Sequence, residues 1–418
     1  MHGVGAAQEN AWVTSRSLEE HRSDVLALLS PLAPLDLVLA DALGCVVTDD
    51  VVARANVPAV PIASRDGFAV RTGDTRGARM RPLSLPVTHD VLPGQSPTRL
   101  MPRTAARIAR GGAIPHGADA VVARPTSADV TLFLDVEPPP GEGVVDAGGH
   151  WKANDVVVEA GTRLGAGHIA SLAACGYATA RVFPSPRVAV IAVGSELRGH
   201  LGSTHPSVAP AEPTIDASGP LLAAMLTSAG ARVVRTLAVP DDAPLLRHAI
   251  ADAALQADLV VTLGGVSDDW HDVVGPLLVH AYGGEIRRVR LMPGDQQGLG
   301  IVRDGDAQSV PLLALPGDPV DVAAAFAGFG IDAIMRMRGL TVERPTASVE
   351  QGWQAPFGFA QVVPVRRAED AKQRVSPVGD PAHPLLRDIA AADGVALVAD
   401  DIVEVVEGDA LPILWWQR

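Results

Sequence analysis

The chain has 418 residues, and this length predicts roughly three domains rather than one ordinary core. A hydrophobic fraction of 47% with 20% charged residues is typical of a folded globular protein and excludes a largely disordered chain. The formal net charge of -14 argues against a nucleic-acid surface, which needs clustered Lys and Arg to neutralise phosphates.

The cysteines and the apolar runs bear on the cellular compartment. Cys45 and Cys175 lie far apart in apolar surroundings, which indicates two packed, reduced thiols of a cytosolic protein rather than a disulfide. No apolar run of about 18 residues occurs, and the N-terminus lacks the charged and apolar regions of a signal peptide. We therefore expect a cytoplasmic protein with neither membrane span nor signal peptide.

The first predicted element is a helix that follows a polar, aperiodic leader of residues 1–14. Ser17 is its expected N-cap, Glu20 completes a capping box, and Pro31 ends it. Residues 36–44 form a strand or a helix that leads to an extended segment, 47–53.

Residues 57–149 consist of short β-rich runs separated by Pro and Gly, which predicts a small, mostly β domain. Two turns in it carry polar groups. One places Asp66 before a strand, and the other is the glycine-rich run that begins with Arg110 and Gly111. For each, a plain structural turn is the favoured interpretation, because Asp-Gly is common hairpin chemistry.

From residue 187 strands and helices alternate, which predicts a doubly wound parallel sheet. The expected strands are 188–193, 232–237 and 259–263, and the expected helices are 220–229 and 242–256. The polar segment 199–213 is rich in Gly, Ser and Pro and is interpreted as a mobile loop beside the sheet's ligand-binding edge. The run 310–321 is interpreted as a further strand, a tight Pro-Gly turn and the start of a helix, and the helix continues over 322–336. Residues 341–418 return to β-like alternation, typical of a terminal barrel or sandwich.

The strand at 259–263 ends in the loop 264–272, where Gly264 and Gly265 let the backbone turn and approach a ligand closely. Ligands of open α/β sheets bind outside the carboxyl ends of the strands. The polar residues expected in that crevice are Thr262, Ser267, Asp269 and Asp272.

Several turn motifs occur in a particular order: Ser-Arg-Asp-Gly-Phe-Ala-Val at 64–70, Gly-Gly-Ala-Ile-Pro-His-Gly-Ala-Asp-Ala-Val-Val at 111–122, Asn-Asp at 154–155, Val-Gly-Ser-Glu-Leu at 193–197, Gly-Gly-Val-Ser at 264–267, Met-Pro-Gly at 292–294 and Leu-Pro-Gly-Asp-Pro-Val at 315–320. This order resembles the molybdopterin molybdotransferase family, which includes bacterial MoeA and the E domain of gephyrin. The resemblance covers nearly the whole chain from about residue 16, and the joint order is specific although each motif alone is weak.

The resemblance implies an α/β multidomain homodimer with an active site between the α/β domain of one subunit and the first two domains of the other. The implied domains are an elongated domain (15–56 with 150–185), an inserted β-rich domain (57–149), a MogA/MoaB-like molybdopterin-binding domain (186–340) and a C-terminal β-barrel (341–418). In that family the site takes adenylylated molybdopterin, cleaves it and inserts molybdate with a divalent metal, usually Mg²⁺.

The resemblance also implies the roles of particular residues. The catalytic carboxylates are Asp66, Asp155, Glu196, Asp241 and Asp272, of which Glu196, Asp241 and Asp272 are the implied ligands of Mg²⁺. Carboxylate oxygens suit this hard cation, which bridges phosphates. The implied residues for binding the pterin nucleotide are Arg110, Gly111, Gly194, Thr262, Gly264, Gly265, Ser267, Arg288, Pro293, Gly294, Pro316 and Gly317.

The chain departs from the family pattern at positions that would hold anions. Met292 and Asp295 stand where the family usually has Lys, Asp318 where it has Asn, and Asp321 where it has Ser. In the last domain, Arg387 and Asp388 replace a Ser-Ser pair. Carboxylates at these places oppose anion binding by Coulomb repulsion. The candidates to compensate are Arg110, Arg288 and Arg290, because a guanidinium binds oxyanions bidentately.

Three functions follow as hypotheses, of which the third and weakest is a storage or sensing protein that binds molybdopterin without catalysis. The first is a molybdotransferase of molybdenum-cofactor biosynthesis that uses the retained carboxylates. The second is a gephyrin-like scaffold that keeps the fold but binds a peptide of a membrane receptor or cytoskeletal partner, motivated by the missing lysines and the acidic balance.

Overall fold

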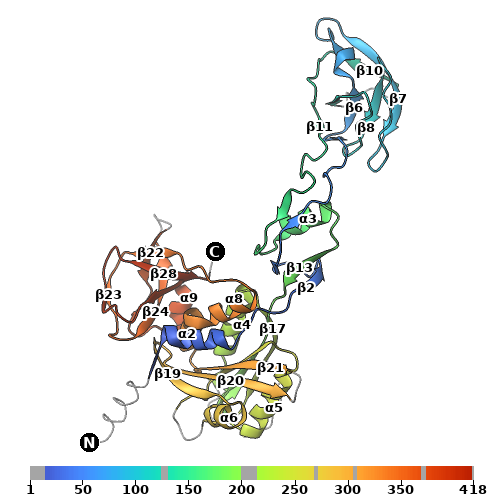
Figure 1. The fold of residues 1–418 in the computed structure, drawn as a ribbon. Coiled ribbons are helices and arrows are strands. Elements are labelled where there is room, and N and C mark those ends of the chain that lie inside the picture. Colours follow the sequence, from blue (N-terminus) through green and yellow to red (C-terminus); the bar gives the residue numbers. More distant parts are fainter. Residues whose placement is uncertain are drawn as a thin grey trace, which may run out of the picture. The chain divides into compact units, whose positions relative to one another are not determined.

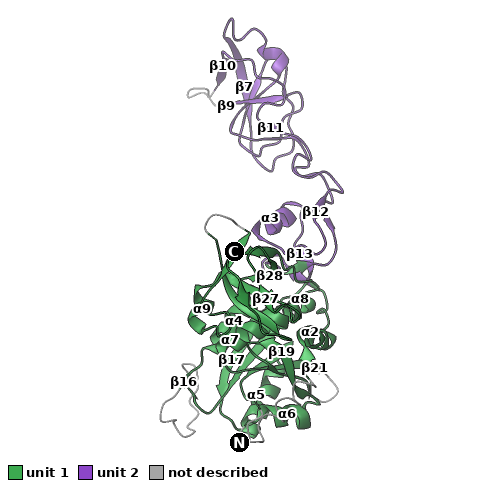
Figure 2. Cartoon of the chain, turned by 90° about the vertical axis from the view of Figure 1, so that its left-hand side faces the viewer, with its two compact units in different colours: residues 1–35, 44–46, 183–418 green, residues 36–43, 47–182 purple. Residues whose placement is uncertain are grey.

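The computed structural model describes residues 15–123, 130–198, 214–267, 272–304, 308–368 and 373–416. The chain forms two compact units, residues 1–35, 44–46 and 183–418 in the larger and residues 36–43 and 47–182 in the smaller (Figure 2). The predicted leader 1–14, the predicted loop 199–213 and Asp269 lie outside the described residues.

The larger unit is built on a parallel sheet with helices on both faces. Strands β14 (Arg187–Val193), β17 (Arg232–Val239), β18 (Leu259–Leu263) and β21 (Gln308–Leu315) are parallel in the order β17-β14-β18-β21. Helix α4 (Ser218–Ser228) packs into the core on one face. Helices α5 (Ala243–Ala254) and α6 (Val274–Ala281) pack on the other. The predicted doubly wound arrangement is confirmed, and it brings the carboxyl ends of four strands to one edge.

The sheet continues beyond β21 with a strand that the sequence did not predict. β20 (Gln296–Asp304) pairs antiparallel with β21 and with β19 (Glu285–Met292). Its Gln-Gln-Gly-Leu-Gly start is typical of a turn. The glycines are there because α6 packs closely on the strand: a Cβ on Gly298 or Gly300 would lie 2.7 or 2.8 Å from a methyl carbon of Leu278.

The helix after β21 begins directly after the Pro-Gly turn, within the run where the sequence predicts a helix start. α7 (Pro319–Ala325) begins at Asp318, whose carboxylate accepts the Val320 amide at 2.7 Å. A π-helical turn (Phe326–Gly330) joins it to α8 (Ile331–Met337). The predicted helix, with its start before residue 322 and its continuation to 336, matches this segment.

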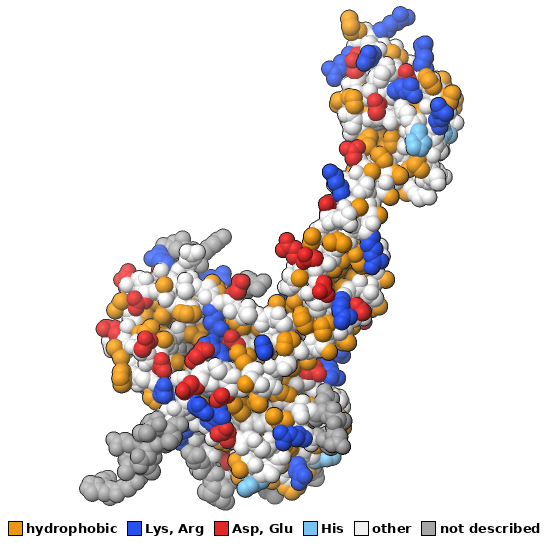
Figure 3. Space-filling view, in the orientation of Figure 1, with side chains coloured by type: hydrophobic (Ala, Val, Ile, Leu, Met, Phe, Trp, Pro, Cys, Tyr) orange, Lys and Arg blue, Asp and Glu red, His pale blue; other side chains and the backbone are white. Residues whose placement is uncertain are grey.

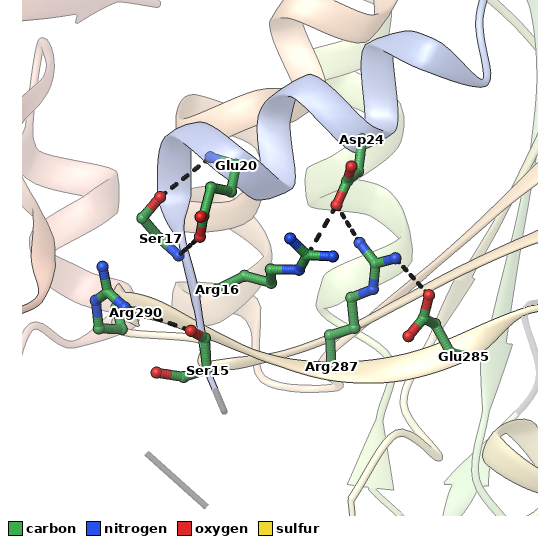
Figure 4. A network of polar contacts seen from close by, with 8 residues as sticks. All are labelled: Ser15, Arg16, Ser17, Glu20, Asp24, Glu285, Arg287 and Arg290. Atoms are coloured by element: carbon green, nitrogen blue, oxygen red, sulfur yellow. Dashed lines mark hydrogen bonds and ion pairs between the residues drawn. The ribbon is translucent and has the colours of Figure 1, made fainter. Parts of the chain in front are cut away.

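The N-terminal helix α2 (Leu18–Ala27) belongs to the larger unit. Its predicted capping box is present, with the Glu20 amide donating to Ser17 Oγ at 3.1 Å and the Ser17 amide donating to Glu20 Oε2 at 2.8 Å (Figure 4). The short strand β1 (Arg16–Ser17) pairs with β19. Arg287 of β19 donates to both Asp24 of α2 and Glu285 of its own strand, which fixes the helix to the sheet (Figure 4).

The C-terminal strands close into a barrel. β24 (Ala360–Arg367), β25 (Arg374–Pro377), β22 (Thr346–Val349), β28 (Ala410–Trp415) and β26 (Gly394–Val398) pair in that order, and β26 returns to pair with β24. The short helix α9 (Leu386–Ala391) precedes β26, and β23 (Trp353–Gln354) pairs with β27 (Glu404–Val405). Of the two architectures that the sequence allowed, the barrel is confirmed.

The smaller unit contains the predicted β-rich part. Its five-stranded sheet runs β10 (Thr131–Leu134), β7 (Leu83–Val91), β8 (Ala105–Ile108), β6 (Gly67–Val70) and β9 (Ala120–Ala123). The remainder holds the helix α3 (Ala166–Ala174) and two pairs of short strands, β4 (Val51–Val52) with β12 (Val156–Val158) and β5 (Ile62–Ala63) with β11 (Val144–Val145) (Figure 1). A further sheet of β2 (Leu35–Val38), β13 (Thr179–Phe183) and β3 (Val46–Val47) belongs mostly to this unit, with Leu35, Val46 and Phe183 counted in the larger one. The four-domain division stays a prediction, since these two units are coarser. In the described part of the chain, no helix combines the length and apolar character that a membrane span needs.

Candidate active site

A cavity of about 540 Å³ opens at the carboxyl edge of the parallel sheet. The residues that follow β14, β17, β18 and β21 all contribute to its wall, as expected where parallel strands end together. Nine of the residues predicted for the site line it: Gly194, Glu196, Asp241, Gly264, Gly265, Ser267, Asp272, Pro316 and Gly317. Sequence segments up to about 120 residues apart are thus brought to one place by the sheet topology.

The floor of the cavity is backbone, and glycine is needed there for space. Gly264 has φ of +92°, and a Cβ on it would lie 2.6 Å from the Val193 carbonyl oxygen. Gly317 approaches from the next strand end, where its Cβ would lie 3.3 Å from the Gly264 Cα. Ser218 of α4 donates to the Gly317 carbonyl at 2.7 Å. The chain segments at Val193, Gly264 and Gly317 are therefore in close backbone contact.

The Glu196 carboxylate lies over the backbone of Gly194. A Cβ at Gly194 would meet both Glu196 oxygens at 2.5 and 2.6 Å, so any larger residue would displace the carboxylate from the cavity wall. The Glu196 carbonyl accepts the Thr214 amide at 2.8 Å, which orders the short strands β15 (Leu197–Arg198) and β16 (Thr214–Ile215) beside the opening.

A reciprocal pair of hydrogen bonds joins the loops after β14 and β17. The Ser195 amide donates to Asp241 Oδ2 at 2.8 Å, and the Asp241 amide donates to Ser195 Oγ at 3.0 Å. The next residue, Asp242, caps α5 by accepting the Leu245 amide at 2.9 Å. One carboxylate of the Asp-Asp dipeptide therefore starts the helix, and the other faces the cavity.

Ser267 and Asp272 flank the segment 268–271, which lies outside the described residues. The Ser267 hydroxyl donates to Asp272 Oδ2 and so holds the two ends of the loop together at the cavity wall. The prediction that a polar loop follows β18 agrees with this arrangement.

The cavity also has walls that sequence reasoning did not assign to the site. Asp216 is buried, and its Oδ1 accepts the Gly219 amide at 2.9 Å at the start of α4. Ser218 and Gln296 line the cavity as well. Asp295 and Asp321 were noted in the sequence as departures from the family pattern, and in the structure both line the cavity. Asp216, Ser218 and Gln296 do not follow a strongly apolar strand in the sequence, so no local pattern marked these three.

The lining is strongly acidic. Six carboxylates face the cavity, and its described lining includes no Lys or Arg: Glu196, Asp216, Asp241, Asp272, Asp295 and Asp321. Burial raises the pKa of Asp321 to about 6, with further contributions from the Asp318 and Asp295 charges. On the face drawn in Figure 3, by contrast, side chains of both signs are interspersed over the larger unit.

Two of the three arginines proposed as substitutes for the missing lysines, Arg288 and Arg290, lie in the larger unit and pair with carboxylates there. Arg288 Nη1 donates to Oδ2 of the cavity residue Asp295 at 2.8 Å. Arg290 contacts Asp400 and donates to the Ser15 carbonyl at 3.3 Å (Figure 4). Neither is among the residues that line the cavity.

Three other predicted binding residues lie near the cavity without lining it. Thr262 is fully buried within β18, and no hydrogen-bond partner of its hydroxyl is found among the described residues. Pro293 and Gly294 form the turn between β19 and β20, where a Cβ on Gly294 would lie 3.2 Å from the Asp321 Cβ. That turn carries Asp295 to the cavity.

The smaller unit brings three of its predicted residues together. Asp66 Oδ1 accepts the Arg110 amide at 2.8 Å, and the adjacent Gly111, with φ of +81°, donates to the Ala63 carbonyl at 2.8 Å. Asp155 lies in a separate turn, where its Oδ2 accepts the Lys152 amide at 2.7 Å. Each carboxylate orders a turn, and the catalytic roles of Asp66 and Asp155 stay predictions.

No group of three or more His, Cys, Asp or Glu in the described ranges is placed to hold a metal ion. The predicted ligands Glu196, Asp241 and Asp272 share the cavity wall, each from a different strand-end loop. All are oxygen donors, the type that a hard divalent cation prefers.

Comparison with known proteins decides the family. Residues 16–176 match the MoeA N-terminal region (domain I and II), and residues 189–336 match the probable molybdopterin binding domain. The chain is 32% identical over 413 residues to molybdopterin molybdenumtransferase 2 of Mycobacterium tuberculosis (strain ATCC 25618 / H37Rv), covering 95% of this chain and 99% of that protein. The chain belongs to the molybdopterin molybdenumtransferase family. The resemblance read from the ordered motifs is thereby confirmed.

Other relatives agree. The molybdopterin molybdenumtransferase of Staphylococcus aureus (strain COL) is 30% identical over 306 residues, 72% of this chain and 70% of that protein. Among solved structures, the molybdopterin biosynthesis MoeA protein from Pyrococcus horikosii matches with a TM-score of 0.71 at 22% identity, covering 97% of this chain and all of that one. The structural likeness shows a MoeA-like fold, and the cavity lies within the part that matches the molybdopterin binding domain.

Proposed function

We propose that this protein is a molybdopterin molybdenumtransferase, a transferase of molybdenum-cofactor biosynthesis. The observation that carries the proposal is the likeness to proteins of that name over nearly the whole chain. The cavity adds support, since it gathers glycine loops and carboxylates from four strand ends in the region that matches the molybdopterin binding domain. The reaction that we propose is insertion of molybdate into adenylylated molybdopterin with release of AMP.

Particular roles are proposed for the cavity residues. The Gly264–Gly265 and Pro316–Gly317 turns leave room for the pterin nucleotide against bare backbone, because their close packing excludes side chains. Glu196, Asp241 and Asp272 are the oxygen donors proposed for Mg²⁺, although in the described structure they share the cavity wall without forming a ready metal cluster. Bound there, Mg²⁺ would supply charge neutralisation for phosphate and molybdate oxygens. Ser195 keeps the Asp241 carboxylate facing the cavity through the reciprocal hydrogen bonds.

The acidic lining makes dependence on a divalent cation a strong expectation. An anionic nucleotide near six carboxylates is repelled unless cations lie between them. The repulsion of two unit charges about 4 Å apart is about 1 kcal/mol in water and larger in a less polar site. We therefore expect binding of the pterin nucleotide to require Mg²⁺ and to weaken on chelation.

The assay that tests the function mixes the purified protein with adenylylated molybdopterin, Mg²⁺ and molybdate and measures AMP by chromatography. A family member of known activity serves as positive control. We expect AMP release from this protein, reduced at least about a hundredfold in the variant Asp241→Asn, as when a positioned charge is lost from an active site. Absence of AMP alongside an active control would contradict the proposal. The variants Asp66→Asn and Asp155→Asn test the proposed catalytic roles in the smaller unit in the same assay.

A homodimer and a cytoplasmic location complete the proposal. Sedimentation equilibrium at micromolar concentration should give twice the mass of 43.3 kDa. The alternative of a peptide-binding scaffold is not favoured, because the relatives compared above carry the names of transferases. Calorimetry that showed no binding of the pterin nucleotide with Mg²⁺ would reopen it.

A further inference from the structure

One end of the five-stranded sheet in the smaller unit carries exposed arginines and methionines. Residues 76–81 contain three arginines around Met80, residues 99–103 contain two around Met101, and neither run has an acidic residue. All five arginines are exposed, as are Met80 at 93% and Met101 at 58%. On the face drawn in Figure 3, Lys and Arg side chains gather over the β-rich part of this unit. We call the seven residues the Arg-Met surface: Arg76, Arg79, Met80, Arg81, Arg99, Met101 and Arg103.

The two loops of the Arg-Met surface are held in place by the core and by each other. Ala78 is fully buried in the hydrophobic core of the β-rich part. The adjacent Gly77 amide donates to Glu137 Oε1 at 2.7 Å. The Arg103 amide donates to Asp74 Oδ2 at 2.6 Å, which joins the second loop to the segment that leads into the first. The surface is therefore ordered before any partner arrives, which lowers the entropic cost of binding.

The carboxylates at this end of the sheet bind the backbone rather than the arginines. Asp74 and Glu137 accept the amides named above, and Asp119 accepts both the amide and the hydroxyl of Thr72 at 2.7 Å. In the described part of the chain, the five guanidinium groups of the Arg-Met surface make no ion pair with a carboxylate. Their charge is thus open to an anionic partner.

The Arg-Met surface lies at the opposite end of the sheet from the residues predicted for the reaction. Strands β6 and β8 pair antiparallel. Asp66 precedes β6 and Arg110 follows β8, so both stand at one end. The loop 76–81 follows β6 and Arg103 precedes β8, which places them at the other end. Strands of 4 residues separate the two ends by on the order of 10 Å. A partner at the Arg-Met surface therefore does not occupy the turn that Asp66 orders.

The residue types of the Arg-Met surface favour a protein as the partner. Arginine and methionine are both enriched in protein–protein interfaces relative to the rest of the surface. Methionine adapts to apolar side chains of irregular shape, and a guanidinium binds a carboxylate bidentately. A membrane fits less well, because membrane surfaces are contacted by Trp, Phe and Leu, and the two loops expose none of these.

We propose that the Arg-Met surface is a docking site for an acidic segment of a partner protein. Carboxylates of that segment pair with the arginines, and its apolar side chains cover Met80 and Met101. The inference goes beyond the proposed function, since the surface belongs neither to the cavity nor to the predicted Asp66 turn. It adds an interaction that holds the protein beside a partner without blocking either.

The experiment uses a fluorescent peptide of repeated Glu-Glu-Leu as the probe and measures its binding to the full chain by anisotropy. A peptide of repeated Gln-Gln-Leu has the same length and apolar content but no charge. We expect the acidic peptide to bind at least about tenfold more tightly, because several exposed ion pairs that are weak alone act together. Its affinity should fall as sodium chloride is added, since salt screens exposed pairs.

Matched variants test whether the binding belongs to the Arg-Met surface. The double variant Arg79→Glu with Arg103→Glu should weaken binding of the acidic peptide at least about tenfold, because attraction becomes repulsion at two positions. Arg163→Glu with Arg247→Glu makes the same charge change at exposed arginines elsewhere and should stay within about twofold of the wild type.

A further variant tests the apolar part of the surface. Met80→Ser with Met101→Ser should weaken binding of the acidic peptide by about threefold, because less apolar surface is buried. Circular dichroism spectra that match the wild type establish that each variant is folded.

Four outcomes would overturn the proposal. They are equal affinity for the two peptides, equal weakening by the two arginine double variants, no binding of the acidic peptide up to about 1 mM, and tighter binding to phosphatidylserine vesicles than to the peptide. The last would assign the surface to a membrane. The titration contains no pterin or molybdate, and Arg79→Glu with Arg103→Glu should release AMP at the wild-type rate. Failure of the AMP assay would therefore reject the proposed reaction and leave the docking site.

Discussion

The cavity has two sides that are built by different means. Its floor is backbone, where Gly264 and Gly317 approach so closely that a single added carbon atom would collide with or crowd a neighbour. Its acidic side is made of side chains, among them Asp295 and Asp321, which are brought to the cavity where the Gly294 turn packs on the start of α7. The floor limits the shape of the cavity, and the acidic side determines its charge. Changes in the floor should therefore cost stability, whereas changes on the acidic side should alter the response to pH.

The largest effect is expected at Gly264. The substitution Gly264→Ala places a Cβ 2.6 Å from the Val193 carbonyl oxygen at a φ of +92°, so it combines a clash with backbone strain. We expect the free energy of unfolding to fall by about 2–4 kcal/mol. Urea denaturation followed by tryptophan fluorescence measures this change.

A matched control separates strain from collision. Gly283 also has a positive φ, +57°, but nothing lies within 4 Å of its added Cβ. Gly283→Ala should therefore cost only about 1 kcal/mol, the price of the left-handed conformation alone. Equal losses at the two positions would show that close packing of the floor is not the reason for Gly264.

On the acidic side, Asp321→Asn should stabilise the protein in a pH-dependent way. The folded-state pKa of about 6 lies above 3.8, the ordinary value for an aspartate, so the folded protein holds this proton more tightly than the unfolded chain. Wild-type stability from this group is full below about pH 4 and is lost as the pH rises through about 6. The variant has no such loss, so its advantage should appear between these values and level off above.

The size of that advantage follows from the shift. Each pKa unit corresponds to about 1.4 kcal/mol, and partial exposure of the carboxylate reduces the full amount, so we expect about 1–2 kcal/mol at about pH 8 and almost none at about pH 4. Thermal unfolding of both proteins across this range is the measurement. A constant difference at all pH values would mean that packing, and not charge, is what the substitution changes.

The hydrogen bonds between the loops after β14 and β17 are tested at Ser195 and Asp241. Because each residue donates its amide to the other's side chain, the two single variants Ser195→Ala and Asp241→Ala should not be additive. A double-mutant cycle in urea should give a coupling energy of about 1 kcal/mol. A coupling near zero would indicate that the loops after β14 and β17 are held by other contacts.

The sequence predicted the floor better than the acidic side, for a physical reason. Buried parallel strands are continuous β-branched runs, and the loops after them carry Gly pairs, so Gly264 and Gly317 stand out along the chain. Asp216 and Asp295 come from turns beside short or polar strands, and only the three-dimensional fold shows that they face the same cavity. Strand β20 was missed for a related reason, since its glycines reflect contact with α6 and not a turn.

The predicted compensation by arginines illustrates the same limit. Arg288 and Arg290 lie on β19 as alternate residues, and the sequence shows their charge but not their partners. In the structure Arg288 pairs with Asp295, and Arg290 pairs with Asp400. Whether an arginine is available to bind an anionic ligand depends on which carboxylates pair with it in the fold. Spacing along the chain does not reveal these pairings.

The smallest effect is expected at Ser218, whose hydroxyl donates to the Gly317 carbonyl at 2.7 Å and so ties α4 to the floor. Ser218→Ala removes one partly buried neutral hydrogen bond, and we expect a loss of about 1 kcal/mol in the free energy of unfolding. Ser228→Ala, at the exposed end of the same helix, is the control and should be neutral or slightly stabilising because Ala is the better helix former. If both variants behave alike, the Gly317 turn keeps its position through the close approach to Gly264 alone, and the floor is held entirely by backbone.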